Sequence, residues 1–292
     1  MILTNKYNLP EVIVKAVSES RRPNPDYFHV TEFISPPLIR HLKMLHWDEL
    51  EEDVSERLWS LLGLSVHAVL DNVDLPDALH EEHLAGIFNL WDGRAVKIVG
   101  RPDLWKENEI TDWKVTSVYS FLIGDKPEWE RQLNLYRWLY KNYGFETKSL
   151  KVHAILRDWM TSKAGIGDYP PIPFQTINVR IWDDKEMNDY MLCQNYRHEI
   201  PMLDDTAICT PEERWRRPTT YAVMKAGRKR AIRVFGNPDD AAAYQDQYES
   251  ACHVEIRQGA DIRCERYCPV RMFCPVKVAT KKKESDEQGE GG

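Results

Sequence analysis

The sequence predicts an α/β fold in which helices flank a mixed sheet, followed by a separate C-terminal part. Apolar residues recur at helical spacing in two long segments, and runs with strand character lie between and after these segments. Three cysteines crowded into residues 263–275 mark the C-terminal part. The chain has 292 residues, of which 42% are apolar, so it is long enough and apolar enough for one large or two small globular domains.

Two amphipathic helices are predicted in the core. The first covers Asp53–Leu70, where Asp53 or Ser55 can cap the start, and the second covers about Pro127–Tyr143 and ends before Gly144. A shorter helix is expected after the turn at Pro36-Pro37. The apolar faces of the two long helices are formed by Leu58, Leu61, Leu62, Val66 and Val69 in the first, and by Trp129, Leu133, Tyr136 and Tyr140 in the second.

Five runs have strand character, and the Asp92-Gly93 turn separates the first two. The order of helix, antiparallel strands, helix and strand predicts a mixed sheet. The five runs are His83–Trp91, Ala95–Leu104, Glu109–Thr116, Ser149–Trp159 and Pro173–Trp182.

Four regions follow from these patterns. We expect an N-terminal extension at 1–30, a core at 31–185, a C-terminal subdomain of helices and loops at 186–278, and a disordered polar tail at 279–292. Cys193 and Cys252 lie in helical patterns and are expected to be core residues.

Composition and targeting signals exclude several classes of protein. The formal net charge of −7 argues against a protein that coats nucleic acid generally. No run of 18 apolar residues predicts a transmembrane helix, and the N-terminus has no signal-peptide pattern. We therefore expect a cytoplasmic protein without a membrane partner, in which clustered cysteines bind metal more often than they form disulfides.

Two aspartates and a lysine are placed where chemistry is possible. Asp103 is expected at the end of one strand and Asp112 near the end of its neighbour, so that a hairpin brings the two carboxylates together. Mg²⁺ binds such hard oxygen ligands, and Lys114 points to the same face as Asp112 because strand side chains alternate. Taken alone, the spacing fits two solvated aspartates and a surface lysine equally well.

Two neighbouring helices add polar residues to this group. His67 follows Gly63 by four residues on the first helix, and Gln132 and Tyr136 share a face of the second. A lone histidine is usually structural, and core packing explains Tyr136 equally well. The position of all three residues on helices that flank the strands nevertheless favours a shared site.

The order of these motifs resembles that of the PD-(D/E)XK nuclease superfamily. Gly63-x3-His67, Pro102-Asp103, Asp112-x-Lys114 and Gln132-x3-Tyr136 follow one another as in its RecB-like branch, which includes Cas4, the AddB nuclease domain and phage-type exonucleases. The resemblance covers roughly residues 30 to 160, and it implies a restriction-endonuclease-like core and possible phage origin.

The resemblance also implies roles for individual residues. His67, Asp103, Asp112 and the backbone carbonyl of Trp113 would bind Mg²⁺ or Mn²⁺, and Lys114 would be the catalytic lysine. Gln132 and Tyr136 would hold the DNA or the catalytic lysine in place.

The cysteine cluster predicts a metal centre in the C-terminal subdomain. Cys264, Cys268 and Cys274 lie within eleven residues, and Cys209 is the favoured fourth ligand because it begins the adjacent basic segment. Cas4-like and AddB-type nucleases resemble this arrangement and carry a [4Fe–4S] cluster, but their upstream cysteine has no counterpart here, since the first cysteine is Cys193. Four thiolates fit either an iron–sulfur cluster or Zn²⁺.

Basic residues offer contacts to DNA phosphates, although a solvated surface and, for Arg157, an ion pair with Asp158 are alternative interpretations. The candidate phosphate contacts are Arg157, Arg214, Arg216, Arg217, Arg228, Lys229 and Arg230.

These features together predict a metal-dependent deoxyribonuclease, with an exonuclease on single-stranded or linear duplex DNA favoured. A structure-specific endonuclease and a DNA-binding recombination adaptor that does not cut are the two alternatives. DNA is the expected partner, with other recombination proteins as possible further partners.

Overall fold

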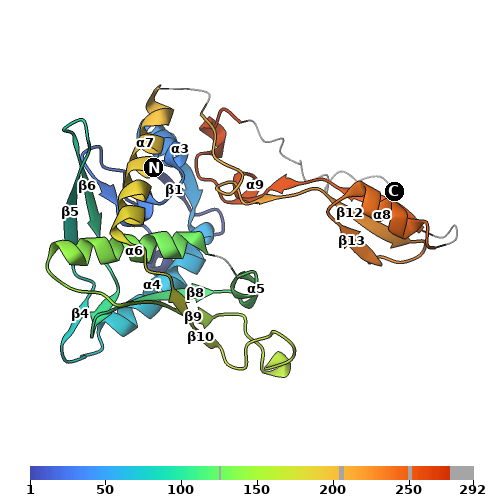
Figure 1. Cartoon of the computed structure of the whole chain (residues 1–292), viewed down its shortest axis with the longest axis horizontal. Helices are drawn as coiled ribbons and strands as arrows, with labels where there is room; N and C mark the ends of the chain where they lie inside the picture. Colours follow the sequence, from blue (N-terminus) through green and yellow to red (C-terminus); the bar gives the residue numbers. More distant parts are fainter. Residues whose placement is uncertain (125, 204–206, 249–251, 277–292) are drawn as a thin grey trace. The chain divides into compact units, whose positions relative to one another are not determined.

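The computed structural model describes residues 1–124, 126–203, 207–248 and 252–276, and Figure 1 shows the course of the chain. The chain divides into two compact units, Met1–Asp205 and Thr206–Gly292. Both contain helices and sheets, so the mixed α/β class predicted from the sequence is confirmed. The predicted tail at 279–292 lies outside the described residues. None of the helices in the described ranges is long and apolar enough to cross a lipid bilayer.

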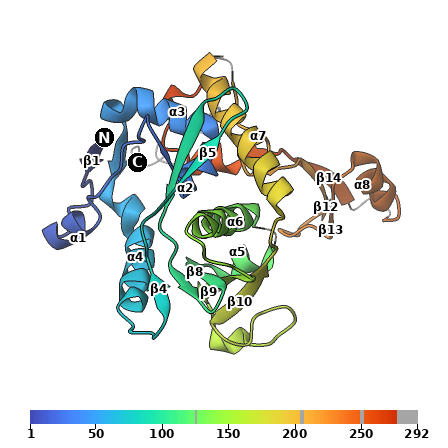
Figure 2. The same cartoon turned by 60° about the vertical axis from the view of Figure 1, so that its left-hand side comes forward.

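The first unit is built around a five-stranded mixed sheet with the order β10-β9-β8-β7-β4. Only β8 and β9 pair in parallel, and helix α6 (Pro127–Asn142) connects them as a crossover. In Figure 2, α6 lies beside these strands. The strands are β4 (Ala78–His80), β7 (Leu104–Lys106), β8 (Glu109–Thr116), β9 (Ser149–Leu156) and β10 (Phe174–Val179).

A second sheet in this unit has the order β2-β6-β5, and a parallel pair joins β1 to β3. Figure 2 shows the β5–β6 hairpin, which corresponds to the first two predicted strands. The bounds are β1 (Ile2–Thr4), β2 (Phe28–His29), β3 (Glu51–Asp53), β5 (Leu84–Asn89) and β6 (Ala95–Gly100).

The predicted strand Ala95–Leu104 is wrong as one element. It breaks at Gly100, and its last residue begins β7 in the other sheet. Pro102 explains the break, because proline has no N–H to donate to a ladder. Asp103 therefore lies in the connection between two sheets instead of at a strand end.

Helix α6 supplies much of the core, and its sequence pattern explains why. Leu133, Tyr136 and Tyr140 recur at helical spacing and are buried, as predicted from the sequence. Gly100 allows α6 to approach β6 closely, because a Cβ there would lie 2.7 Å from Leu139 Cδ1 and 2.9 Å from Tyr136 Cε1. The apolar residues of α6 thus determine which face of the helix is buried in the core, and they also determine where its polar residues, such as Gln132, lie.

Helix α4 (Leu58–Asp71) confirms the predicted element but not its burial. A 3-10 turn (Val54–Arg57) precedes it, and Asp53 caps that turn by accepting a hydrogen bond from the backbone N–H of Ser55 at 3.0 Å. No residue of α4 is buried, and Leu58, Leu62 and Val69 of its apolar pattern are exposed. The remaining helices are α1 (Glu11–Ala16), α2 (Val30–Phe33), α3 (Pro37–His46), α5 (Val118–Leu122) and α7 (Asp184–Leu203).

Helix α7 belongs to the first unit, although the sequence placed it in the C-terminal subdomain. Met187 and Met191 are part of the same buried cluster as α6, so the unit extends past the predicted boundary between residues 185 and 186. Cys193 lies on α7 as predicted for a helix, but it is exposed and not a core residue.

His198 of α7 is buried against α2 as a neutral imidazole. Its Nε2 donates a hydrogen bond to the Phe33 carbonyl at 2.9 Å, and its ring lies 4.7 Å from the ring of Phe28. Burial lowers the pKa of His198 to about 4, and the nearby Arg40 and Arg197 act in the same direction. His198 therefore binds a proton less readily in the folded unit than in the unfolded chain.

We expect the free energy of unfolding to fall as the pH drops from about 6.5 to about 4, because the unfolded chain binds a proton at His198 in this interval and the folded chain does not. The full effect is roughly 3 kcal/mol. His198→Gln should lose less stability over the same interval, while the exposed His83→Gln control should behave as wild type. Denaturant titrations at several pH values measure this, and an equal acid loss in wild type and His198→Gln would contradict it.

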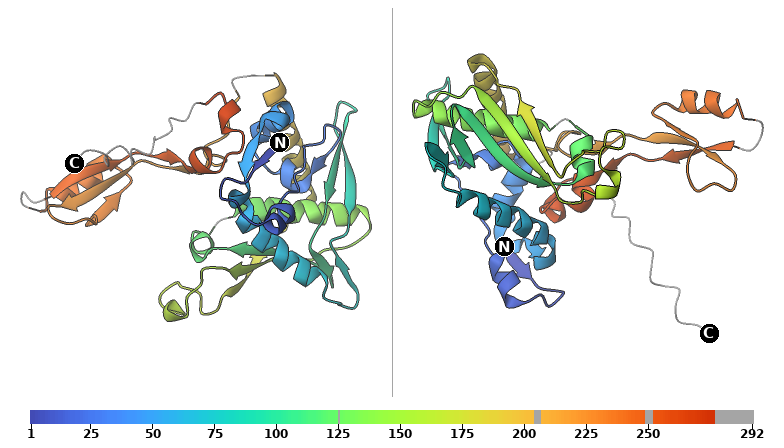
Figure 3. Two further views of the ribbon diagram at one scale, coloured as in Figure 1. Left: turned by 180° about the vertical axis from the view of Figure 1, so that it is seen from behind. Right: turned by 90° about the horizontal axis from the view of Figure 1, so that it is seen from below.

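The described part of the second unit contains β-strands as well as helices and loops, which corrects the expectation of helices and loops alone. A three-stranded sheet of order β13-β12-β14 carries helix α8 (Pro238–Gln245), and Figure 3 shows both. Cys252 begins β14 and so lies in a strand, not in the predicted helix. The other elements are β11 (Arg216–Arg217), β12 (Thr220–Lys225), β13 (Arg233–Phe235), β14 (Cys252–Arg257), β15 (Ala260–Asp261), α9 (Ile262–Arg266) and the 3-10 turn Arg271–Phe273.

Candidate active site

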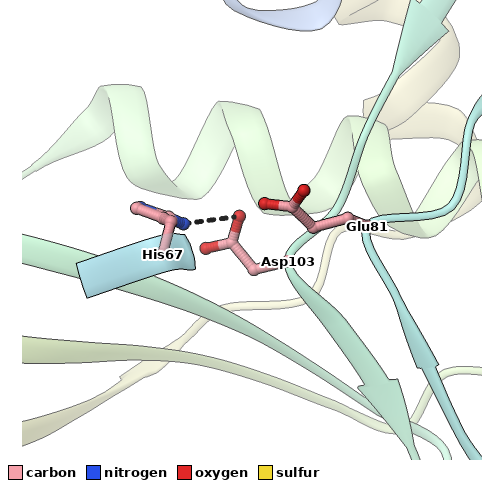
Figure 4. A group of neighbouring side chains, drawn as sticks. All are labelled: His67, Glu81 and Asp103. Atoms are coloured by element: carbon pink, nitrogen blue, oxygen red, sulfur yellow. Dashed lines mark ion pairs between the residues drawn. The ribbon is translucent and has the colours of Figure 1, made fainter. Parts of the chain in front are cut away.

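A group of three potential metal-binding side chains lies in the first unit. His67, Glu81 and Asp103 each offer one ligand atom, and these atoms all lie within 4.8 Å of one another. Figure 4 shows the three side chains pointing toward one another from α4, from the loop after β4 and from the connection before β7. His67 Nδ1 is 3.4 Å from Asp103 Oδ1, and this hydrogen bond raises the pKa of His67 against the opposing effect of burial.

Glu81 was not predicted from the sequence. Its backbone has a positive φ of 46°, and its N–H donates to the Asp103 carbonyl at 3.2 Å, which ties the loop after β4 to the connection before β7. Arg101 forms an ion pair with the Glu81 carboxylate and donates to its carbonyl at 3.0 Å. The pair of glutamates at 81–82 was the available sequence signal, but nothing local indicates that the first faces Asp103.

A second group surrounds Asp112 on β8. Lys114 Nζ lies 2.6 Å from Asp112 Oδ2 and donates a hydrogen bond to Gln132 Oε1 at 3.2 Å. Gln132 Nε2 donates to Asp112 Oδ1 and to the Tyr136 hydroxyl, both at 3.1 Å. The structure thus brings together four of the residues selected from the sequence, from β8 and from one face of α6.

The surroundings of Asp112 disfavour the charged form of its carboxylate. It is 1% exposed, and burial raises its pKa to about 6, with Lys114 opposing this rise and Asp103 adding to it. Despite the nearby ammonium, Oδ2 has no hydrogen-bond partner with acceptable geometry among the described residues. Burial, with Asp112 as a further cause, also raises the pKa of Tyr136, so its hydroxyl stays protonated.

The two groups are in contact through the backbone of β8. The Trp113 N–H donates to Asp103 Oδ2 at 2.7 Å, and Asp112 and Lys114 both influence the pKa of His67. In a strand, the N–H and C=O of one residue point to the same side, so the Trp113 carbonyl also faces the Asp103 side. Asp112 itself is turned toward Lys114 and Gln132 and is not part of the three-residue group.

The side chain of Trp113 points away from this site. It lines a hollow of about 480 Å³ together with Thr111 and His153, and these side chains alternate along the strands with Asp112 and Lys114. The tryptophan ring packs against the His153 ring in a tilted arrangement, with 4.9 Å between the ring centroids. Only the backbone of Trp113 can therefore serve the candidate site.

The four cysteines selected from the sequence lie in the second unit and influence one another electrostatically. Among the described residues, however, only His67, Glu81 and Asp103 bring three potential ligand atoms within 4.8 Å of one another, so the four sulfurs are not gathered that tightly. Burial raises the pKa of the Cys209 thiol to about 12, and Glu213, Cys268, Cys264 and Cys274 raise it further through their charges. The pKa of Cys264 is raised by burial and then by Cys268. None of the described cysteines forms a disulfide.

Backbone and side-chain contacts hold the Cys209 segment against the other three cysteines. The Arg263 N–H donates to the Arg214 carbonyl at 3.1 Å, and Arg263 Nη1 donates to the Glu213 carbonyl at 3.0 Å. The rings of Trp215 and Tyr267 are in tilted contact, with 5.6 Å between their centroids. The segment that contains Cys209 is thus bound to the segment that contains Cys264 and Cys268.

The predicted phosphate contacts fall into three kinds of environment. Arg214 and Arg216 form ion pairs with Asp261 at 3.1 and 3.2 Å, so part of their charge is already compensated. Arg157 lies over the ring of Trp59 and not in an ion pair with Asp158. Arg217 on β11 is exposed, as are Arg228, Lys229 and Arg230 between β12 and β13, and these four have neither the Asp261 ion pair nor the Trp59 contact.

Comparison with known proteins adds little. No protein-family model matches the chain, and no curated protein matches it. One solved structure, described as "Crystal structure of SSO0001", is similar over 66% of this chain and 82% of that chain, with 16% sequence identity and a TM-score of 0.47. Similarity at this level assigns neither a family nor a function to the chain.

Proposed function

We propose that the chain is a metal-dependent deoxyribonuclease with a PD-(D/E)XK core in its first unit, acting as an exonuclease on single-stranded or linear duplex DNA. The observation that carries the proposal is one connected network of motif residues. Lys114, Asp112 and Gln132 contact one another directly, and the Trp113 backbone links them to Asp103 and its partner His67. Structural packing alone does not require a buried carboxylate, a lysine and an amide in this order.

The residues present fit a divalent cation of the Mg²⁺ or Mn²⁺ type. The carboxylates of Asp103 and Glu81 are hard oxygen ligands, and His67 offers a nitrogen that Mn²⁺ accepts. Asp112 Oδ2 is buried, and its one close partner among the described residues is the Lys114 ammonium, which forms an ion pair but no well-oriented hydrogen bond with it. The oxygen therefore keeps a lone pair that a cation could use. When bound here, such a cation would polarise a phosphate oxygen and make a water molecule more acidic.

The surrounding residues of the chain position Lys114. Its ammonium is held between the Asp112 carboxylate and Gln132 Oε1, while the Tyr136 hydroxyl fixes the orientation of the Gln132 amide by accepting from Nε2. An ammonium fixed in this way can donate a hydrogen bond to the attacking water or offset charge that develops on the phosphate. Gln132 and Tyr136 thus act through Lys114.

We expect His67→Ala and Glu81→Gln each to raise the metal concentration needed for half-maximal activity by roughly tenfold or more, because each removes a side chain from the three-residue group. A metal titration measures this, with a thermal melt beside it. For His67, a lower melting temperature with unchanged metal dependence would identify a structural histidine. For Glu81, unchanged metal dependence would leave it as the partner of Arg101 alone.

In the second unit, we propose that Cys209, Cys264, Cys268 and Cys274 bind one structural metal centre. The charges of the other three cysteines help to raise the pKa of Cys209, and those of Cys268 and Cys274 help to raise the pKa of Cys264, so the four residues lie within electrostatic range of one another. A bound metal cation would stabilise the thiolate forms that this environment otherwise disfavours. The resemblance to Cas4-like nucleases favours a [4Fe–4S] cluster, and Zn²⁺ is the alternative with the same ligands. The centre would hold the Cys209 segment and the C-terminal cysteines together.

A panel of DNA substrates tests the proposed activity. We expect wild type with Mg²⁺ or Mn²⁺ to shorten end-labelled linear single strands or duplexes progressively and to leave covalently closed circles intact. Cleavage of circles would replace the exonuclease with an endonuclease. DNA binding without cleavage of any substrate in the panel would identify a binding protein and contradict the proposal.

A further inference from the structure

An exposed aromatic–cation pair lies beside the candidate active site in the first unit. Trp59 on α4 is 64% exposed, and the guanidinium carbon of Arg157, at the end of β9, lies 4.4 Å from the centroid of its ring. A stack at such an exposed position contributes little to folding stability. Neither the metal group nor the Asp112 network uses these two residues.

Arg157 keeps its hydrogen-bonding capacity open. Among the described residues it forms no ion pair, and the neighbouring Asp158 instead accepts a hydrogen bond at 2.7 Å from the Val118 N–H at the start of α5. A guanidinium has five N–H donors in a planar fork that matches a phosphate, and stacking on the indole holds that plane in one orientation. Arg157 is therefore a positioned cation without an anionic partner in the part of the chain that the structure describes.

Trp59 is aligned with the candidate metal group. Trp59, Gly63 and His67 are spaced by four residues on α4, so they lie in one row along the helix. No atom lies within 4 Å of the position of a Cβ on Gly63, so the row is open between the tryptophan and the histidine. The space over Gly63 is therefore free for a ligand.

The second residue of the pair reaches the same region from the sheet. The Arg157 N–H donates to the Thr116 carbonyl at 2.9 Å, and Thr116 follows Lys114 by two residues on β8. Eight residues of helix separate Trp59 from His67, which is ~12 Å along the axis. At ~3.4 Å per stacked nucleotide, a strand leaving the metal group would reach the indole after roughly three to four nucleotides.

We propose that Trp59 and Arg157 form a nucleotide-binding subsite, in which the indole stacks on an unpaired base and the guanidinium binds the adjacent phosphate. The inference rests on the proposed nuclease function, whose substrate it specifies. A base inside a duplex has both faces covered by its neighbours, so the indole can stack only on a frayed or single-stranded base. The subsite therefore selects strands that are unpaired a few nucleotides from the scissile phosphate.

Binding to a fluorescein-labelled deoxythymidine oligonucleotide tests the subsite, measured by anisotropy on the full chain carrying Lys114→Ala so that the strand stays intact. We expect Trp59→Ala to weaken binding roughly 5- to 100-fold, the range found when one stacked base loses its aromatic partner. Arg157→Gln should also weaken binding and reduce its dependence on salt. Trp59→Phe should retain most of the affinity. Trp91, which is 90% exposed near the turn between β5 and β6, supplies the matched control Trp91→Ala, expected to bind as its parent.

The outcomes separate this inference from the proposed function because binding does not require cleavage. If wild type cuts DNA but Trp59→Ala and Arg157→Gln bind single strands as tightly as their parent, the subsite is wrong and the nuclease stands. If the strand binds through Trp59 but wild type cuts no DNA, the proposed function is wrong and the subsite stands. Equal losses for a blunt duplex and a single strand, no strand binding at all, or a change of oligomeric state in place of DNA affinity would each overturn the subsite.

Discussion

Lys114→Ala is expected to lower the rate of DNA cleavage by about 10²- to 10⁴-fold, the range for a side chain that assists proton transfer or stabilises charge in the transition state. Asp112 and Gln132 are the side chains that Lys114 contacts in the network described above, and the lysine side chain itself is 26% exposed. Its removal should therefore disturb little of the buried core. DNA binding and the melting temperature should therefore change little. Initial rates on labelled DNA, with binding measured separately, check this result.

Asp112→Asn sharpens the same prediction. The substitution removes a fully buried carboxylate whose pKa burial raises to about 6, so the folded chain should be as stable as wild type or more stable. Activity should nevertheless fall as far as in Lys114→Ala, because a neutral amide is a poor metal ligand. A buried charge that costs stability and supports activity is the pattern expected of a functional site.

The exposed Lys97 on β6 supplies the control for both variants, since Lys97→Ala removes a lysine of the same unit that lies over the ring of Tyr27 and belongs to the other sheet, not to the sheet that contains β8. It should cut DNA like wild type. Cleavage by Lys114→Ala or Asp112→Asn at a rate near that of wild type would contradict the assignment of the site.

Loss of one cluster cysteine should have the largest structural effect in the second unit. We expect Cys268→Ser or Cys274→Ser to lose the metal and to become protease-sensitive beyond residue 206, because a structural metal contributes folding free energy that the unfolded chain cannot recover elsewhere. The first unit, which has its own buried core, should remain resistant. Limited proteolysis with mass spectrometry and a metal analysis of the same samples measure both effects.

Cys252→Ser is the matched control, because Cys252 lies in β14 of the same unit and is not among the residues that raise the pKa of Cys209. It should keep its metal and its protease resistance. Anaerobically purified protein should be brown if the centre is an iron–sulfur cluster. Colourless protein with one zinc per chain would keep the structural centre and reject the cluster, and folded protein without any metal would reject both.

Local patterns were sufficient for the elements with strong periodicity. Helix α6 and strand β8 have nearly the predicted bounds, because one carries a continuous apolar face and the other is a regular strand between clear turn signals. The same patterns placed Lys114, Gln132 and Tyr136 on facing elements, and the structure brings them into contact.

Features that depend on contacts between distant parts of the chain could not be predicted. Glu81 reaches Asp103 only because the loop after β4 folds against the connection before β7, and the ion pairs of Arg214 and Arg216 need Asp261, which lies far along the chain. The break before β7 was different, since Pro102 was a visible signal against a continuous strand. The predicted burial of the apolar face of helix α4 was wrong for a physical reason. Apolar residues at helical spacing predict that a helix has an apolar face, but they do not show whether other parts of the protein cover that face.

The most direct test of the central claim is a time course on linear DNA labelled at one end, with metal removed and then restored. Wild type should degrade the DNA in Mg²⁺, stop when a chelator is added, and resume when Mg²⁺ is supplied in excess, while a parallel Lys114→Ala preparation should remain inactive throughout. Degradation that continues in chelator, or that Lys114→Ala performs equally well, would contradict a metal-dependent nuclease built on this site, as would intact DNA in every wild-type sample with Mg²⁺ or Mn²⁺.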